Sequence, residues 1–428
     1  MKRVRFSNPM PSAQRLISVL KEQGLAVAWA KLLHYAYLKA ARLGFAFRVK
    51  PHGSPLAASW QSLAEAQVFY GQRPSEIGRV LHLAIIGETQ LAQCTKYRIE
   101  QMAQLAEGLG MRVSIVDHRQ TGEAIAALQL ASHVMFYRIE AHDHFWMYFY
   151  EARRLGLPIL YDVDDPVFSI PACNSAYFEA PLALRQHHLE AAPRFLAAMA
   201  GCDAVSASTP ALAEEVARFL PRPVWLRRNF ADAQSLAFGP SEQPEKPGNV
   251  LALASGSEFR LMDLVTIVPV LSQFLRAHPD WRLHLIGVGL DPSGLFEADI
   301  LRRIEQQPVL PYEAYLSQLQ NADIVLLPLA EGLHNRCKSA VRAIDAAAVA
   351  RPVIAQHSGD LAQLIRDGET GILAASELEW AAALEKLSAN SALRHEMGRA
   401  AYQRLQQYWA DPLDPAITAP ELSAWLRQ

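Results

Sequence analysis

Short apolar runs alternate with amphipathic segments over the middle of the chain, and this alternation predicts a parallel β-sheet. The strand-like runs are Val80–Gly87, Met111–Val116, His133–Tyr137 and Pro158–Val163. The segments between them follow helical spacing, at Thr95–Leu109, Gly122–Leu130 and Phe145–Leu155. Continuous apolar strands separated by helices of about 10 to 15 residues are typical of a parallel sheet covered by helices on both faces.

A stretch rich in proline, glycine and charge, residues 239–248 (GPSEQPEKPG), interrupts this alternation and is interpreted as an interdomain linker. The pattern then restarts with the runs Asn249–Ala254, Arg282–Gly287, Ile324–Leu327 and Pro352–Ala355. We therefore predict an α/β fold with two doubly wound Rossmann-like domains, residues 80–238 and 249–410, facing each other across a cleft. Residues 411–428 are predicted to form a helical tail.

The first 79 residues are predicted to be a helical extension followed by a linker. In the segment 25–42, apolar residues recur at helical spacing, at Leu25, Trp29, Leu32 and Leu33. Residues 1–50 carry ten Lys/Arg and one acid, a net charge of +9, and because the whole chain sums to −2 the remainder carries −11. A basic amphipathic helix with Trp and Tyr suits an anionic membrane surface. A helical extension packed on the main body is the alternative.

Composition narrows the class of protein. Hydrophobic residues make up 51% and charged residues 20% of the 428 residues, which is typical of a folded protein of two or three domains. The four cysteines are scattered, which argues against a disulfide framework or a structural zinc site and favours a reducing compartment. No uncharged apolar run reaches the roughly 18 residues of a membrane span, and the first residues do not resemble a signal peptide. We expect a cytoplasmic protein, peripheral to the inner face of the plasma membrane if the basic extension binds lipid.

The strongest candidate site is the segment 331–355, EGLHNRCKSAVRAIDAAAVARPVIA. Lys338, Ser339, Arg342 and Asp345 stand at the start and along one side of its predicted helix. A lysine, a serine and the N–H groups of a first helical turn suit a phosphate, and an acid further along suits ribose hydroxyls. This combination points to a nucleotide-sugar. The alternative is a solvated helix face with Arg342 and Asp345 as an ordinary surface pair.

Two further groups of polar residues follow predicted strands of the first domain. In LYDVDDPVF (160–168), Asp162, Asp164 and Asp165 could bind a metal as D-x-D, orient or deprotonate an acceptor hydroxyl, or cap a turn; we favour the acceptor role. In RIEAHDHF (138–145), Arg138 and His142 could face the cleft, while capping of the next helix is the alternative.

A Gly-Ser turn opens the second domain, in SGSEFR (255–260). The backbone N–H groups of Gly256 and Ser257 could approach a phosphate, and Arg260 could add positive charge.

The order of these motifs resembles the GT-B glycosyltransferases of family 4, the glycosyl transferases group 1 type, particularly the bacterial enzymes of cell-surface polysaccharides. The resemblance covers roughly residues 80 to 410. It rests on CDAVSASTPAL (202–212), RNFAD (228–232), ADIVLLPL (322–329) followed by N-x-x-K-S-x-x-R-x-x-D (335–345), and DGETGIL (367–373).

The resemblance implies a nucleotide-sugar in the second domain, an acceptor in the first, retention of anomeric configuration, and no metal or other cofactor. It places Lys338 and Ser339 on the diphosphate and makes Asp345, the second acid of an E-x7-E motif, the ribose residue. Asn335 is the first residue of the motif N-x-x-K-S-x-x-R-x-x-D. The first acid of the motif falls on Cys337, for which Glu331 could substitute, and the usual H-D after the first-domain strand is Asp164-Asp165. The lysine often found after the glycine turn is Met262, which leaves Arg260 as the nearest cation.

We therefore predict an enzyme, a glycosyltransferase that moves a sugar from a nucleoside diphosphate to a polysaccharide or lipid-linked acceptor. No nucleic-acid partner is expected. A sugar-nucleotide 2-epimerase on the same architecture is one alternative, although an obvious set of acids and histidines for elimination is absent. A degenerate GT-B module that binds a nucleotide-sugar without transferring it is the other, and Cys337 and Met262 support it.

Overall fold

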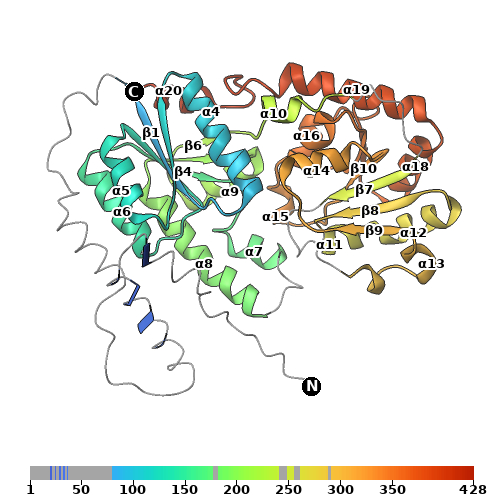
Figure 1. The fold of residues 1–428 in the computed structure, drawn as a ribbon, viewed down its shortest axis with the longest axis horizontal. Helices are drawn as coiled ribbons and strands as arrows, with labels where there is room; N and C mark the ends of the chain where they lie inside the picture. Colours follow the sequence, from blue (N-terminus) through green and yellow to red (C-terminus); the bar gives the residue numbers. More distant parts are fainter. Residues whose placement is uncertain are drawn as a thin grey trace.

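The computed structural model describes residues 80–176, 182–240, 248–254, 261–287 and 291–428, together with eight residues between positions 20 and 36. Within these residues the chain forms two α/β domains that stand side by side, each built on its own six-stranded sheet (Figure 1). The predicted α/β class and its two doubly wound sheets are confirmed. The predicted domain boundaries stay predictions, and residues 241–247 of the linker lie outside the described residues.

The first domain is a parallel sheet with strand order β2-β1-β3-β4-β5-β6. Its strands are β1 (His82–Gly87), β2 (Arg112–Asp117), β3 (His133–Tyr137), β4 (Ile159–Val163), β5 (Ala204–Ala207) and β6 (Val224–Leu226). Its helices are α3 (Ala92–Cys94), η2 (Thr95–Glu100), α4 (Gln101–Gly108), α5 (Thr121–Leu130), α6 (Asp143–Arg154), α7 (Ile170–Ala176), α8 (Leu182–Gly201), α9 (Pro210–Phe219) and α10 (Ala233–Leu236). Alternate residues of β1 enter separate cores on the two faces of the sheet, which is why the strand is apolar throughout.

The second domain repeats this plan with strand order β12-β11-β10-β7-β8-β9, again all parallel. Its strands are β7 (Val250–Ala254), β8 (Arg282–Ile286), β9 (Ile304–Gln307), β10 (Ile324–Leu327), β11 (Val353–Gln356) and β12 (Ile372–Ala374). Its helices are α11 (Leu261–Val265), α12 (Val268–Ala277), η3 (Pro292–Gly294), α13 (Ala298–Leu301), α14 (Tyr312–Leu319), α15 (Leu333–Arg336), α16 (Val341–Ala348), α17 (Leu361–Leu364), α18 (Glu377–Ser388) and α19 (Ser391–Tyr408). The last helix, α20 (Pro420–Leu426), packs on the first domain.

The direction of winding reverses once in each sheet, between β1 and β3 in the first and between β7 and β10 in the second. In doubly wound folds ligands bind outside the carboxyl ends of the strands at such reversals. The loops after β3 and β10 carry predicted site residues, and the loop after β4 lies beside them.

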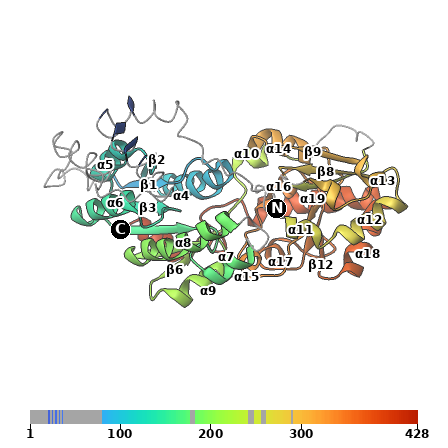
Figure 2. The same cartoon turned by 90° about the horizontal axis from the view of Figure 1, so that it is seen from below.

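The C-terminal segment ties the two domains together. Helix α19 covers the second domain, and the chain then returns to the first, where the backbones of Arg227 and Thr418 pair (Figure 1). Leu422, Trp425 and Leu426 of α20 belong to the core of the first domain. On the other side of the junction α7 and α15 lie together (Figure 2).

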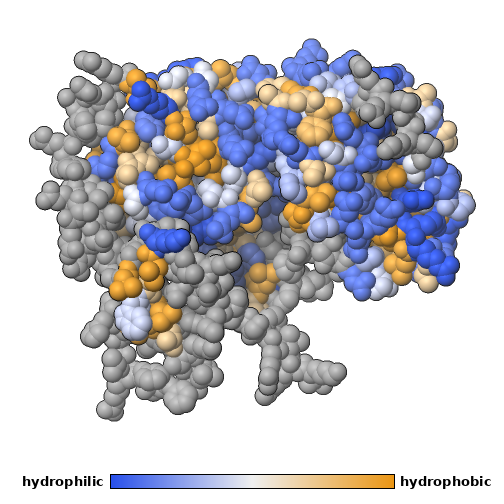
Figure 3. Space-filling view, viewed as in Figure 1, coloured by the Kyte–Doolittle hydropathy of each residue, from blue (hydrophilic) through white to orange (hydrophobic). Residues whose placement is uncertain are grey.

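Hydrophilic residues cover most of the second domain on the face seen in Figure 3, and hydrophobic patches are more frequent on the first. Among the described residues, no helix combines the length and the apolar character that crossing a membrane would require.

Candidate active site

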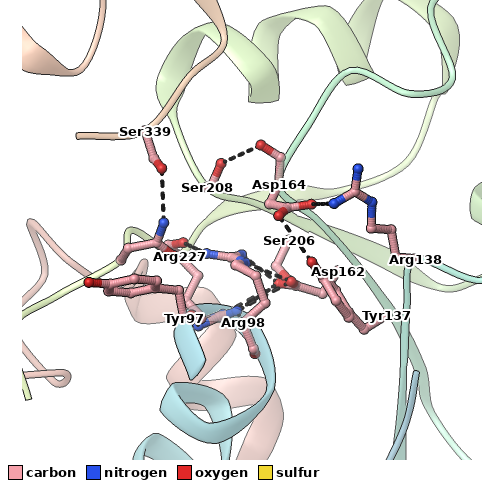
Figure 4. Close-up of polar contacts among 11 residues, drawn as sticks. Tyr97, Arg98, Tyr137, Arg138, Asp162, Asp164, Ser206, Ser208, Arg227 and Ser339 are labelled. Carbon is pink, nitrogen blue, oxygen red and sulfur yellow. Dashed lines mark hydrogen bonds and ion pairs between the residues drawn. The ribbon is translucent and has the colours of Figure 1, made fainter. Parts of the chain in front are cut away.

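Two acids follow β4, and residues at the end of β3 hold one of them in place. Tyr137 donates a hydrogen bond to Asp164 at 3.0 Å, and the Arg138 guanidinium lies 3.6 Å from Asp164 and 3.4 Å from Asp165 (Figure 4). Arg138 has a φ of 56°, a left-handed conformation that costs a non-glycine residue roughly 1 kcal/mol or more and is concentrated at functional sites. Burial alone would lower the pKa of Arg138, but Asp164 raises it well above its ordinary value.

Asp165 contacts the second domain directly. The Lys338 ammonium donates a hydrogen bond to the Asp165 carboxylate, and the two side chains are 18% and 16% exposed. Burial alone would raise the pKa of Asp165, but the positive charges of Lys338, His334 and Arg138 hold it well below its usual range. The carboxylate therefore stays ionised at neutral pH, between cations of both domains.

Asp162 has a different role from its two neighbours in the sequence. It is fully buried, and its carboxylate accepts hydrogen bonds from Arg98 at 2.6 and 2.8 Å and from Ser206 at 2.5 Å (Figure 4). Arg227 lies 3.2 Å away as a second cation. Asp162 therefore binds two arginines inside the domain, and its partners are not those of Asp164. In the described part of the chain, no group of three or more His, Cys, Asp or Glu is arranged to hold a metal ion.

Ser339, from the segment before α16, and Asp360, from the loop after β11, lie at the N-terminal end of α16. Asn229, from the motif RNFAD, donates a hydrogen bond to the Ser339 hydroxyl at 2.9 Å (Figure 4). The backbone N–H of Ala340 donates to the Asp360 carboxylate at 3.1 Å, and Asp360 also pairs with Arg228. The helix begins at Val341, so Lys338 precedes it and does not share a helix face with Arg342 and Asp345 as predicted.

Asp345 lies inside the molecule, between two tyrosines. Its Oδ1 accepts hydrogen bonds from Tyr97 of η2 and from Tyr312 of α14, the latter at 2.8 Å, and the two phenol oxygens are 3.1 Å apart. Asp345 is 3% exposed, which contradicts the alternative of a surface ion pair with Arg342. Burial raises the pKa of Asp345 to about 6.

Cys337 stands where the first acid of the E-x7-E motif would be, and it is part of the first domain's core. Its side chain is fully buried in the same cluster as residues of β4 and β5. Its carbonyl oxygen accepts a hydrogen bond from the Thr209 hydroxyl at 2.9 Å. Burial raises the pKa of its thiol to about 12. Position 337 is thus turned away from the second domain's ligand-binding edge.

The other predicted donor-binding residues of this segment surround the loop after β10. Glu331 is exposed. Asn335 donates to Asp263 at 2.7 Å and to the Ala330 carbonyl at 2.9 Å, so its amide group stabilises the loop itself. Arg342 donates to the carbonyl of Ala254 at 3.2 Å and therefore reaches the carboxyl end of β7.

Two predictions concern other loops. His142 precedes α6, makes no side-chain capping hydrogen bond, and its ring lies 5.7 Å from that of His118; burial lowers its pKa. The structure does not bring it to the Asp165–Lys338 pair through any described hydrogen bond. Gly256, Ser257 and Arg260 lie outside the described residues.

Tyr97, Tyr312 and Asn229 contact predicted site residues without having been predicted themselves. Tyr97 is separated from Asp345 by 248 positions and Asn229 from Ser339 by 110. The local sequence carries no signal for Tyr97, because its helix η2, with the sequence TKYRIE, consists mostly of polar residues.

Comparison with known proteins gives a family match for the second domain and a fold match for most of the chain. Residues 269–410 match the family model described as glycosyl transferase-like. A search of curated protein sequences finds no match.

Solved structures of low sequence identity share the fold. Sucrose-phosphate synthase from Thermosynechococcus elongatus is 15% identical with a TM-score of 0.55, covering 81% of this chain and 98% of that one. HepE from Anabaena in complex with UDP and glucose is 13% identical with a TM-score of 0.52, covering 77% and 95%. A glycosyltransferase from Rickettsia africae is 11% identical with a TM-score of 0.53, covering 82% and 96%.

At such identities the likeness establishes the fold, and the family match comes from the second domain. The two parallel sheets, the match over residues 269–410 and the motifs around Lys338 agree with one another. The chain accordingly has the two-domain GT-B fold, and its second domain is similar to the glycosyl transferase-like family.

Proposed function

We propose that this chain is a glycosyltransferase that takes a sugar from a nucleoside diphosphate and passes it to a saccharide or lipid-linked saccharide. The observation that carries the proposal is the contact between Lys338 and Asp165, because it joins a cation at the ligand-binding edge of the second sheet to an acid at the same edge of the first. A donor held by the second domain would meet an acceptor held by the first at this point. HepE, which shares the fold, has been crystallised with UDP and with UDP-glucose.

The chemistry follows from the groups present. The Lys338 ammonium and the Ser339 hydroxyl would bind the diphosphate and stabilise the negative charge that develops on it as the sugar leaves. Asp345 would accept hydrogen bonds from the ribose hydroxyls. Asp164 and Asp165, held beside Arg138, would orient the acceptor hydroxyl that attacks the sugar. The family resemblance implies that this transfer retains the anomeric configuration and requires no metal.

We also propose that the basic N-terminal extension brings the enzyme to an anionic membrane surface, where a lipid-linked acceptor would lie. Among its described residues, Leu25 and Trp29 are 73% and 62% exposed, which leaves apolar surface available to lipid.

The donor site is tested by isothermal titration of UDP and GDP in EDTA. We expect one of them to bind the wild-type protein and to bind Lys338→Ala about ten to a hundred times more weakly, since a charge-assisted hydrogen bond contributes about 1.5–3 kcal/mol. Lys386→Ala, which removes an exposed lysine from α18 of the same domain, is the matched control and should bind like the wild type.

Binding of neither nucleotide, or binding that is indifferent to Lys338, would contradict the proposed donor site. Binding without transfer to any acceptor would favour a non-catalytic nucleotide-sugar module. Conversion of the nucleotide-sugar in the absence of an acceptor would favour the epimerase.

A further inference from the structure

Three residues that we assign to the donor site make hydrogen bonds with the first domain. Each of the three contacts joins one side chain from residues 338–345 to one from the other domain. The pairs are Lys338 with Asp165, Ser339 with Asn229, and Asp345 with Tyr97. Two of the first-domain partners, Asp165 and Tyr97, stand where a group of the donor would make the same kind of contact. Asp165 offers anionic oxygen to the lysine, as a phosphate would, and Tyr97 offers a hydroxyl to the acid, as a ribose would.

Of the three contacts, the ion pair between Lys338 and Asp165 would be weakened most by a bound donor. Both side chains are largely buried, at 18% and 16% exposure, so their charges are only partly screened by solvent. A diphosphate that took Lys338 would bring negative charge next to the Asp165 carboxylate. Two anions beside one ammonium repel each other, and this repulsion favours separation of Asp165 from Lys338 once the donor is bound.

Asp165 has a second cation to which it can remain attached. The Arg138 guanidinium lies 3.4 Å from Asp165 and belongs to the first domain, so it stays on the acceptor side when Lys338 is withdrawn. Beside Arg138 the Asp165 carboxylate would remain ionised, and the oxygen that had accepted a hydrogen bond from Lys338 would be available to another hydrogen-bond donor. An acceptor hydroxyl can donate to this oxygen.

We propose that Asp165 is an exchangeable counterion of the donor site and thereby sets the order of substrate binding. In the empty enzyme it neutralises Lys338; the donor diphosphate takes its place, and the released carboxylate then receives the acceptor hydroxyl. Donor binding precedes productive acceptor binding for this reason. The inference rests on the proposed role of Lys338 and adds to it a competition between the chain's own carboxylate and the donor.

The competition predicts that removing the Asp165 charge tightens nucleotide binding. Asp165→Asn should bind UDP or GDP, whichever the wild type prefers, about fivefold more tightly in EDTA, because the donor no longer displaces an ion pair of about 1 kcal/mol. Asp164→Asn is the matched control: it removes the same charge one residue away, where the hydrogen bond is to Tyr137 and the nearby cation is Arg138. Its nucleotide affinity should stay within about twofold of the wild-type value.

Hydrogen exchange of the wild-type protein tests the same idea without a variant. Addition of the nucleotide should increase exchange in the segment 164–169 of the first domain, and Lys338→Ala should show the increase with no nucleotide added. Weaker or unchanged nucleotide binding by Asp165→Asn, an equal gain in Asp164→Asn, or unchanged exchange would each overturn the inference. If the wild type binds nucleotide through Lys338 but these results are not obtained, the proposed donor site is supported and the proposed displacement of Asp165 by the donor is contradicted.

Discussion

The protonation state of Asp345 determines how well it can accept hydrogen bonds from the hydroxyls of a ribose. Burial raises its pKa to about 6, although hydrogen bonds from Tyr97 and Tyr312 oppose the shift. The side chain is therefore a carboxylate above about pH 6 and becomes protonated below it. A protonated carboxyl accepts the two ribose hydroxyls less well than a carboxylate does. The form that binds is thus lost as the pH falls through the raised pKa.

We predict that nucleotide affinity falls as the pH is lowered from about 7.5 to about 5, by at most about tenfold per pH unit below the pKa. Titration calorimetry across this range measures it. The terminal phosphate of a nucleoside diphosphate titrates nearby, so Asp345→Asn is the necessary control. That variant should bind more weakly at pH 7.5 and lose the part of the pH dependence that belongs to Asp345. If nucleotide affinity changes equally with pH in the wild type and in Asp345→Asn, a role of the Asp345 carboxylate in binding is contradicted.

Individual residues of the site could be predicted where a short segment carried them together. Lys338, Ser339 and Asp345 lie within eight positions, and Asp164 and Asp165 are adjacent to a strand. Tyr97 and Asn229 could not be predicted, because their roles arise from contacts between segments more than 100 positions apart. The burial of Asp162 with Arg98 and Arg227 could not be predicted either, because no local sequence pattern shows which of three neighbouring acids points into the core.

At the scale of elements, the apolar pattern located the long central strands and overlooked several short ones. β9 has the sequence IEQQ, which has no apolar run, and β6 and β12 have three residues each. The helix of the candidate site was predicted to start near Lys338, whereas α16 starts at Val341. The helix starts later than predicted because Cys337 is buried in the core of the first domain and the Ala340 N–H donates a hydrogen bond to Asp360.

Because α15 packs on the first domain, we can predict the effect of placing a glutamate at position 337, where the first acid of the E-x7-E motif would stand. Cys337→Glu would place a carboxyl in an apolar core, which costs about 2 kcal/mol or more when it lacks a partner. We expect lower thermal stability and no gain in nucleotide affinity. Cys337→Ala is the control, since it keeps the site apolar and removes little volume. A Cys337→Glu protein of wild-type stability with tighter UDP-glucose binding would show that this segment can turn its side chain to the donor.

At the scale of the whole molecule, the two domains are joined at both ends of their junction. Residues 227–232 and the segment after α19 cross side by side: Arg228 N–H donates to the Ile417 carbonyl, and Ala419 N–H donates to the Leu226 carbonyl. Helix α20 then completes the first domain's core. The opposite side is closed by polar contacts between Asp165 and Lys338 and between Tyr97 and Asp345, and by the burial of Cys337 in the first domain's core. The two crossing segments are suited to act as a hinge, because the chain itself passes between the domains there.

The N-terminal extension gives the molecule its uneven charge, +9 in residues 1–50 against −11 in the remainder. Among the described residues of this segment Ala28 is buried, whereas Leu25, Trp29, Leu32 and Leu33 are 73%, 62%, 37% and 41% exposed. Hydrophobic atoms of these described residues are visible at the lower left of Figure 3. Their exposure favours contact with lipid over packing on the main body, because a packed stripe would hide these side chains.

We predict that the full chain sediments with vesicles containing an anionic lipid and much less with vesicles of neutral lipid. Each basic residue near an anionic surface contributes about 1 kcal/mol, so the binding should weaken as salt is raised. Removal of residues 1–50 should abolish it, and Trp29→Ser should reduce it. Trp146→Ser, which removes an exposed tryptophan from α6 of the first domain, is the matched control. Sedimentation that survives the deletion, or that depends on Trp146 and not on Trp29, would assign membrane contact to the folded domains instead.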